Sequence, residues 1–156
     1  MSPQAAYREP AHHVWLRPDS IQNNMTIIDK GGPSGLQEFQ LGLMSGQVQV
    51  TIGAQGGDWA LFWRSNARVT ALEWTHIAVT WDGGIIHVYI NGVLNDTIPF
   101  YGVVRNGTSD VLLGAARSAL VNGAPQDFFV GTIDELYIYG PLFACFLRRF
   151  FVLLLK

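Results

Sequence analysis

Hydrophobic and polar residues alternate with a period of two along much of the chain, which is typical of β-strands that bury one face. The stretches 38–44 (EFQLGLM) and 47–52 (QVQVTI) show the alternation clearly, with apolar residues at every second position. Ser45-Gly46 lies between them, and glycine tolerates the backbone angles of a tight turn. These residues therefore predict an antiparallel hairpin.

The middle of the chain repeats this pattern in 74–81 (WTHIAVTW) and 85–91 (IIHVYIN), which are joined by the turn residues 82–84 (DGG). Asn91-Gly92 then gives the strongest short hairpin signal in the sequence, because a type I′ turn needs positive φ at both central residues. The sequence therefore predicts consecutive strands joined by hairpin turns, the last of which begins at residues 93–94.

Further strands are expected at 14–17, 25–29, 111–113 and 128–139, and no helical stripe occurs before Pro141. Many short strands separated by Gly, Asn and Asp turns are typical of an antiparallel β-sandwich or barrel. No internal repeat or linker divides the pattern, so a single all-β domain is predicted.

The same strand pattern predicts which way several tryptophan and histidine side chains point. Trp15, Trp74 and Trp81 lie on predicted strands and are interpreted as core residues. His76 and His87 alternate with apolar positions, so they are expected to face outward or to fill the second face of their strands.

Composition narrows the class of protein. The chain has 156 residues, of which 49% are hydrophobic and 14% charged, which favours one folded domain over disorder. A net charge of -2 without a basic patch excludes a typical nucleic-acid binder. No apolar stretch before Pro141 is long enough to span a membrane, residues 1–13 lack the apolar core of a signal peptide, and Cys145 has no second cysteine to pair with.

The segment 142–156 (LFACFLRRFFVLLLK) is almost wholly apolar and atypical of a soluble domain. It is shorter than a membrane-spanning helix, so it is interpreted as packed on the sandwich or as foreign to the fold. An apolar segment that does not fold back over the sheet predicts poor solubility.

Four motifs are similar to laminin-G-like domains of the concanavalin A-like lectin/glucanase superfamily. They are WTHIAVTWDGGIIHVYINGVL at 74–94, LLGAARS at 112–118, FFVGTIDELYIY at 128–139 and HVWLRPDS at 13–20. The resemblance runs over 14–139 and implies a jelly-roll sandwich of two antiparallel sheets. Residues 1–13 and 140–156 depart from the family pattern, so we expect an N-terminally truncated piece of a longer extracellular or surface protein, with 128–139 at a sheet edge.

The resemblance implies a non-catalytic module that binds carbohydrate or a glycoconjugate. The alternatives are a protein-binding adhesion or spacer domain of the same fold and, less favoured, a glucanase-like glycoside hydrolase. Glucanases of this superfamily place carboxylates along one strand in a Glu-x-Asp-x-[x]-Glu arrangement, which this sequence lacks. Asp134-Glu135 is the only adjacent acidic pair that could serve, and neighbours on a regular strand point to opposite faces. The prediction is therefore that the domain is not an enzyme.

Trp59, Trp63 and Tyr101 lie in or near stretches interpreted as loops, where aromatic rings could stack on sugars or cover the core. They are the predicted ligand-binding residues. Asp134 shares strand parity with core-like residues unless a bulge intervenes. Since relatives often bind calcium, Asp134 is a candidate calcium ligand. We favour the alternative, in which its carboxylate accepts backbone N–H bonds, because calcium takes about six to eight oxygens.

Overall fold

The computed structural model describes residues 11–31, 37–53, 55, 59–105, 107–117 and 125–138. Within these ranges every regular element is a β-strand, which confirms the all-β prediction. The strands are β1 (Ala11–Pro18), β2 (Asn24–Gly31), β3 (Gln37–Met44), β4 (Gln47–Gly53), β5 (Trp59–Arg68), β6 (Thr75–Trp81), β7 (Ile85–Ile90), β8 (Val93–Pro99), β9 (Val111–Leu113), β10 (Ala116–Arg117), β11 (Pro125–Gln126) and β12 (Gly131–Ile138).

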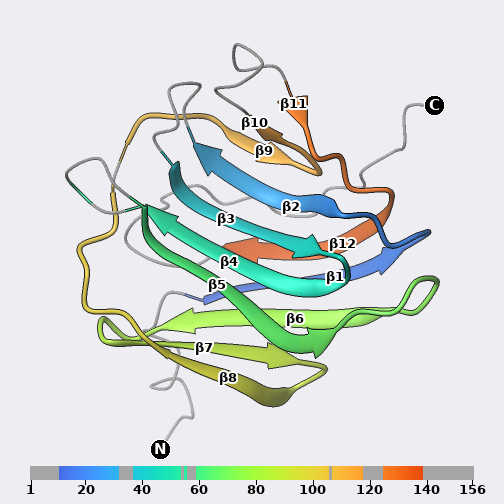
Figure 1. Ribbon diagram of the computed structural model, residues 1–156, viewed down its shortest axis with the longest axis horizontal. Coiled ribbons are helices and arrows are strands. Elements are labelled where there is room, and N and C mark those ends of the chain that lie inside the picture. The colour runs from blue at the N-terminus through green and yellow to red at the C-terminus, as the bar shows by residue number, and fades with distance from the viewer. Residues whose placement is uncertain are drawn as a thin grey trace, which may run out of the picture.

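Two five-stranded antiparallel sheets pack face to face (Figure 1). One has the order β12-β1-β6-β7-β8, the other has the order β5-β4-β3-β2-β9, and β10 and β11 form a small separate ladder. Neighbours within each sheet are often distant in sequence, as β1 is from both β6 and β12. This arrangement is the predicted jelly-roll sandwich of the concanavalin A-like type.

The core lies between the sheets and is built by the period-two pattern. Along β1, β6 and β7, one set of alternate apolar side chains is buried against the opposite sheet, as the regular pleat requires. The buried residues that fill it from the first sheet include Val14, Leu16, Ile77, Val79, Ile86, Val88, Ile98, Ile133 and Leu136, and those from the second include Met25, Ile27, Leu41, Leu43, Val48, Val50 and Ile52.

The predicted hairpins are present. Asn91 and Gly92 have φ values of 50° and 78° between paired residues of β7 and β8, as a type I′ turn requires. Ser45 and Gly46, with φ values of 50° and 83°, join β3 to β4 in the same way. The turn residues in the sequence therefore predicted both hairpin connections correctly.

The long strand β5 was missed by the sequence prediction, which treated Trp59 and Trp63 as loop residues. Trp59 begins β5, and Trp63 pairs with Val50 of β4. The run 59–63 (WALFW) is apolar at every position, so it shows no alternation from which a half-buried strand could be recognised.

Strand β12 lies at an edge of its sheet and pairs with β1. Among the described residues no other strand pairs with it, which agrees with the expectation that this segment is an edge strand. The predictions for residues 1–10 and for the apolar segment 142–156 fall outside the described residues.

Candidate functional site

Trp15 stands on the outer face of the β12-β1-β6-β7-β8 sheet. Its neighbours Val14 and Leu16 are fully buried in the core, so the pleat of β1 turns the Trp15 side chain the opposite way, where it is 37% exposed. Its Cα partner across the ladder is His76 of β6, and the two rings lie 5.0 Å apart between centroids.

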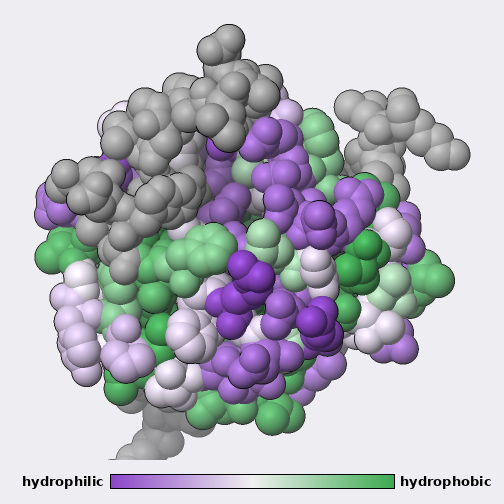
Figure 2. All heavy atoms as spheres, viewed as in Figure 1, coloured by the Kyte–Doolittle hydropathy of each residue, from purple (hydrophilic) through white to green (hydrophobic). Residues whose placement is uncertain are grey.

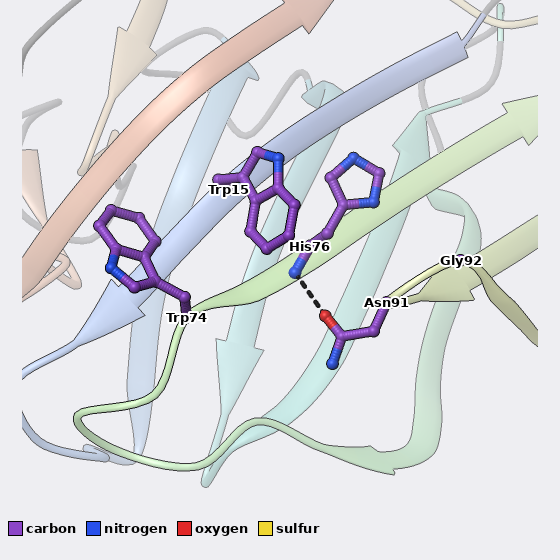
Figure 3. Close-up of a pocket in the computed structure, with 5 residues that line it drawn as sticks. All are labelled: Trp15, Trp74, His76, Asn91 and Gly92. Carbon is purple, nitrogen blue, oxygen red and sulfur yellow. Dashed lines mark hydrogen bonds between the residues drawn. The ribbon is translucent and has the colours of Figure 1, made fainter.

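Trp74 reaches the same face by the same parity. Ile77 and Val79 of β6 are buried, which places Trp74 and His76 on the outer side, and Trp74 is 46% exposed. The prediction that Trp15 and Trp74 belong to the core is therefore wrong. It is borne out only for Trp81, which packs against the core. Figure 3 shows the Trp15 indole between the Trp74 indole and the His76 imidazole.

A hollow of about 450 Å³ is lined by Trp15, Trp74, His76, Asn91 and Gly92. Asn91 comes from the β7–β8 turn, and its Oδ1 accepts a hydrogen bond from the His76 backbone N–H at 2.8 Å (Figure 3). The Asn91 backbone N–H donates in turn to the His76 carbonyl, also at 2.8 Å. Both bonds hold the Asn91 amide in place beside the exposed indoles.

A row of aromatic rings extends the face from Trp15. The His76 ring lies 5.4 Å from that of His13, which stacks at 4.7 Å on Tyr137 of β12. Nδ1 of His13 and Nε2 of His76 are 3.4 Å apart. Desolvation lowers the pKa of both imidazoles, while the charge of Glu135 raises it to a smaller extent.

A second hollow, of about 410 Å³, also involves Trp15 and Trp74 and is completed by Asp134 and Glu135. The β1–β12 register shifts between His13 and Trp15, and Glu135 has φ of 48°, which together define a bulge. The bulge corrects two expectations: Asp134 is partly exposed here and not on the core face, and both carboxylates line one hollow.

Metal binding at Asp134 stays a prediction. Its Oδ1 accepts the Glu135 backbone N–H at 2.8 Å, as the favoured alternative to a calcium ligand expected. Among the described ranges, no three or more His, Cys, Asp or Glu side chains gather in a group able to hold a metal ion.

The aromatic residues predicted to bind ligand lie elsewhere. Trp63 of β5 is 37% exposed, and Tyr101, in the connection after β8, is 80% exposed. The side chain of Trp59 lies outside the described residues. Neither Trp63 nor Tyr101 lines the hollows beside Trp15. The sequence prediction missed the residues that line these hollows. The strand parity that Trp15 shares with His13, and Trp74 with His76, could have shown that these side chains lie on one outer face.

The opposite face of the sandwich holds a smaller hollow of about 170 Å³, which we call the amide hollow. Figure 2 shows strongly hydrophilic side chains over the middle of this face, around β3, β4 and β5. One aromatic side chain, Phe62, lines it, and the Arg64 guanidinium carbon lies 5.8 Å from the Phe62 ring centroid. The residues that line it are Asn24, Met25, Thr26, Gln40, Gly42, Leu43, Met44, Gln49, Phe62 and Asp127.

Comparison with known families identifies the fold. The laminin G-type family model, described as the concanavalin A-like lectin/glucanases superfamily, matches residues 11–142. The chain belongs to this superfamily. The matched region includes the predicted domain 14–139. No curated protein matches the chain in sequence.

Several solved structures share the architecture of this chain at low sequence identity. The CBM40 domain of a Ruminococcus gnavus sialidase, bound to α2,3-sialyllactose, matches with a TM-score of 0.70 and 17% identity over 85% of this chain and 75% of that one. Domain 4 of an extracellular arabinanase from Geobacillus stearothermophilus, in complex with arabinotriose, matches with a TM-score of 0.60 and 23% identity over 85% and 61%.

A Bacteroides ovatus protein described as carbohydrate-binding matches with a TM-score of 0.64 and 16% identity. The match covers 89% of this chain but only 39% of that protein. At these identities the matches to solved structures show the fold alone. Within the described residues, no helix has the length and apolar character needed to cross a membrane.

Proposed function

We propose that this domain is a non-catalytic glycan-binding module of an extracellular or surface protein. We assign its binding surface to the tryptophan site, which comprises Trp15, Trp74, His76, Asn91, Gly92, Asp134 and Glu135. The observation that carries the proposal is the pair of exposed indoles, Trp15 and Trp74, which line two hollows on the outer face of one sheet.

The alternative role of an exposed aromatic is to cover the core, and the strand pleat excludes it here. Val14 and Leu16 point into the core from the same strand, so the Trp15 indole lies on the far side of the sheet from the buried residues. The two indoles leave apolar surface in contact with water, and a bound ligand can bury that surface.

Sugar rings suit this surface because they have an apolar C–H face and polar hydroxyl edges. An indole can stack on the apolar face, while fixed polar groups bind the edges and set orientation. Asn91 supplies an oriented amide, and the Asp134 and Glu135 carboxylates supply acceptors. The glycan complexes of structural relatives support the same class of ligand.

A glycan panel tests the proposal. The panel includes arabinotriose, lactose, sialyllactose, N-acetylglucosamine tetramer and its de-acetylated glucosamine counterpart, with binding measured by calorimetry and by the change in tryptophan fluorescence. We expect at least one glycan to bind, and we expect Trp74→Ala to weaken that binding by about tenfold or more. Trp74 directly precedes β6 and its side chain is 46% exposed, so this substitution leaves the core intact.

Two further variants sharpen the result. Val93→Ala removes an apolar side chain that is 67% exposed at the start of β8 and lines neither hollow, so it should leave the affinity unchanged. Phe62→Ala tests the amide hollow. Binding that survives Trp74→Ala and is lost with Phe62→Ala would move the site to the opposite face, and a chain that binds no glycan but retains a protein partner would favour the adhesion alternative.

The hydrolase alternative is tested on the same panel. The bulge at Glu135 brings two carboxylates to one hollow, which a glycosidase would need. We expect no release of shorter sugars when the glycans are incubated with the domain and analysed by chromatography. Release that Glu135→Gln abolishes would contradict the non-catalytic proposal.

A further inference from the structure

The residues of the tryptophan site favour a positively charged ligand. In its second hollow the exposed indoles of Trp15 and Trp74 lie beside the carboxylates of Asp134 and Glu135. The electron-rich face of an indole attracts cations, and carboxylates attract them more strongly. The two kinds of group therefore favour the same sign of charge on a ligand.

The backbone holds this arrangement. Asp134 is the Cα partner of Trp15, and its Oδ1 is held by the Glu135 N–H at 2.8 Å. Glu135 occupies the bulge position with positive φ and lines the same hollow. Its negative charge extends over the face, because it raises the pKa of both His13 and His76.

The described residues that line the two hollows include no lysine or arginine to offset these carboxylates. Arg17, two residues from Trp15 on the same strand face, donates its Nε–H to the Leu72 carbonyl at 3.1 Å and lines neither hollow. The pKa of His13 and His76 is lowered mainly by desolvation, so both imidazoles stay neutral to lower pH than ordinary histidines.

We propose that the tryptophan site selects glycans by charge, binding sugars that carry protonated amino groups in preference to neutral sugars and disfavouring acidic sugars. The inference rests on the proposed function and specifies its ligand class. An ammonium group on a sugar ring that is stacked against Trp15 or Trp74 would lie near Asp134 and Glu135. A carboxylate such as that of sialic acid would be repelled there.

Matched pairs of glycans test this. The glucosamine tetramer and the N-acetylglucosamine tetramer share one backbone and differ in the charge of the amino groups, and lactose and sialyllactose differ by one acidic sugar. At mildly acidic pH and low salt, we expect the glucosamine tetramer to bind about tenfold more tightly than its acetylated partner. Lactose should bind more tightly than sialyllactose, and added salt should narrow both differences.

The double variant Asp134→Asn, Glu135→Gln removes the charges with little change of shape, since asparagine keeps the Oδ1 acceptor for the Glu135 position's N–H. We expect it to reduce the preference for the glucosamine tetramer to about twofold or less. Circular dichroism and the melting temperature confirm that this variant is folded.

The outcomes separate the two proposals. Equal affinity for the two tetramers, binding of sialyllactose as tight as or tighter than that of lactose, or a preference that the double variant retains would overturn the charge selectivity while leaving glycan binding intact. Failure of every panel glycan to bind would overturn both. Pentalysine that competes as well as the glucosamine tetramer would overturn the assignment of the cation to a sugar, because charge alone would then suffice.

Discussion

His12 makes the stability of this domain depend on pH. It lies near the start of β1, its Nδ1 is inaccessible to solvent, and its ring packs on Phe39 at 4.7 Å between centroids. Burial disfavours the charged imidazolium and lowers the pKa of His12 from 6.5 to about 4. The unfolded chain therefore binds a proton at higher pH than the native domain, so stability is complete above about pH 6.5 and falls as the pH drops toward about 4.

The magnitude follows from the shift. The full difference between 6.5 and about 4 corresponds to about 3 kcal/mol at about 1.4 kcal/mol per pH unit. At about pH 5, where the native His12 is still neutral and the unfolded one is mostly charged, the loss is about 2 kcal/mol. His13 and His76 also have lowered pKa values and act in the same direction.

The assay is urea unfolding of the wild type and of His12→Leu, each at about pH 8 and about pH 5. Other titrating groups are common to both proteins, so their effects largely cancel in the comparison. The wild type should lose about 2 kcal/mol more than the variant between the two conditions. If the stability difference between the proteins were the same at both pH values, the pKa of His12 would not be lowered in the native domain and the reasoning would be refuted.

Two further predictions concern a turn and a metal. Gly92→Val should lower the free energy of unfolding by about 1–2 kcal/mol through backbone strain, since Gly92 has φ of 78° and an added Cβ would meet nothing within 4 Å; an unchanged urea midpoint would contradict the turn assignment. The melting temperature should be the same in calcium as in a chelator, because Asp134 already accepts a backbone N–H. A calcium-dependent rise in the melting temperature that Asp134→Asn abolishes would instead make Asp134 a metal ligand.

Strand parity and turn chemistry could be predicted from the sequence because both are local properties. The alternation in 74–81 decides which side chains share a face, and Asn91-Gly92 specifies its turn through its own backbone preferences. The outward direction of Trp15 was also available from Val14 and Leu16. It was missed because a large apolar side chain on a strand was assumed to belong to the core.

The candidate site depended on relations that no local pattern contains. Trp15 meets His76 only because β1 pairs with β6, and it meets Asp134 only because β1 also pairs with β12. The bulge at Glu135 turns two neighbouring carboxylates toward one hollow, where a regular strand would have separated them. The order of strand pairing and the position of bulges depend on how whole sheets bury their apolar faces together. Only the tertiary structure could therefore place Asp134 and Glu135 beside the exposed indoles.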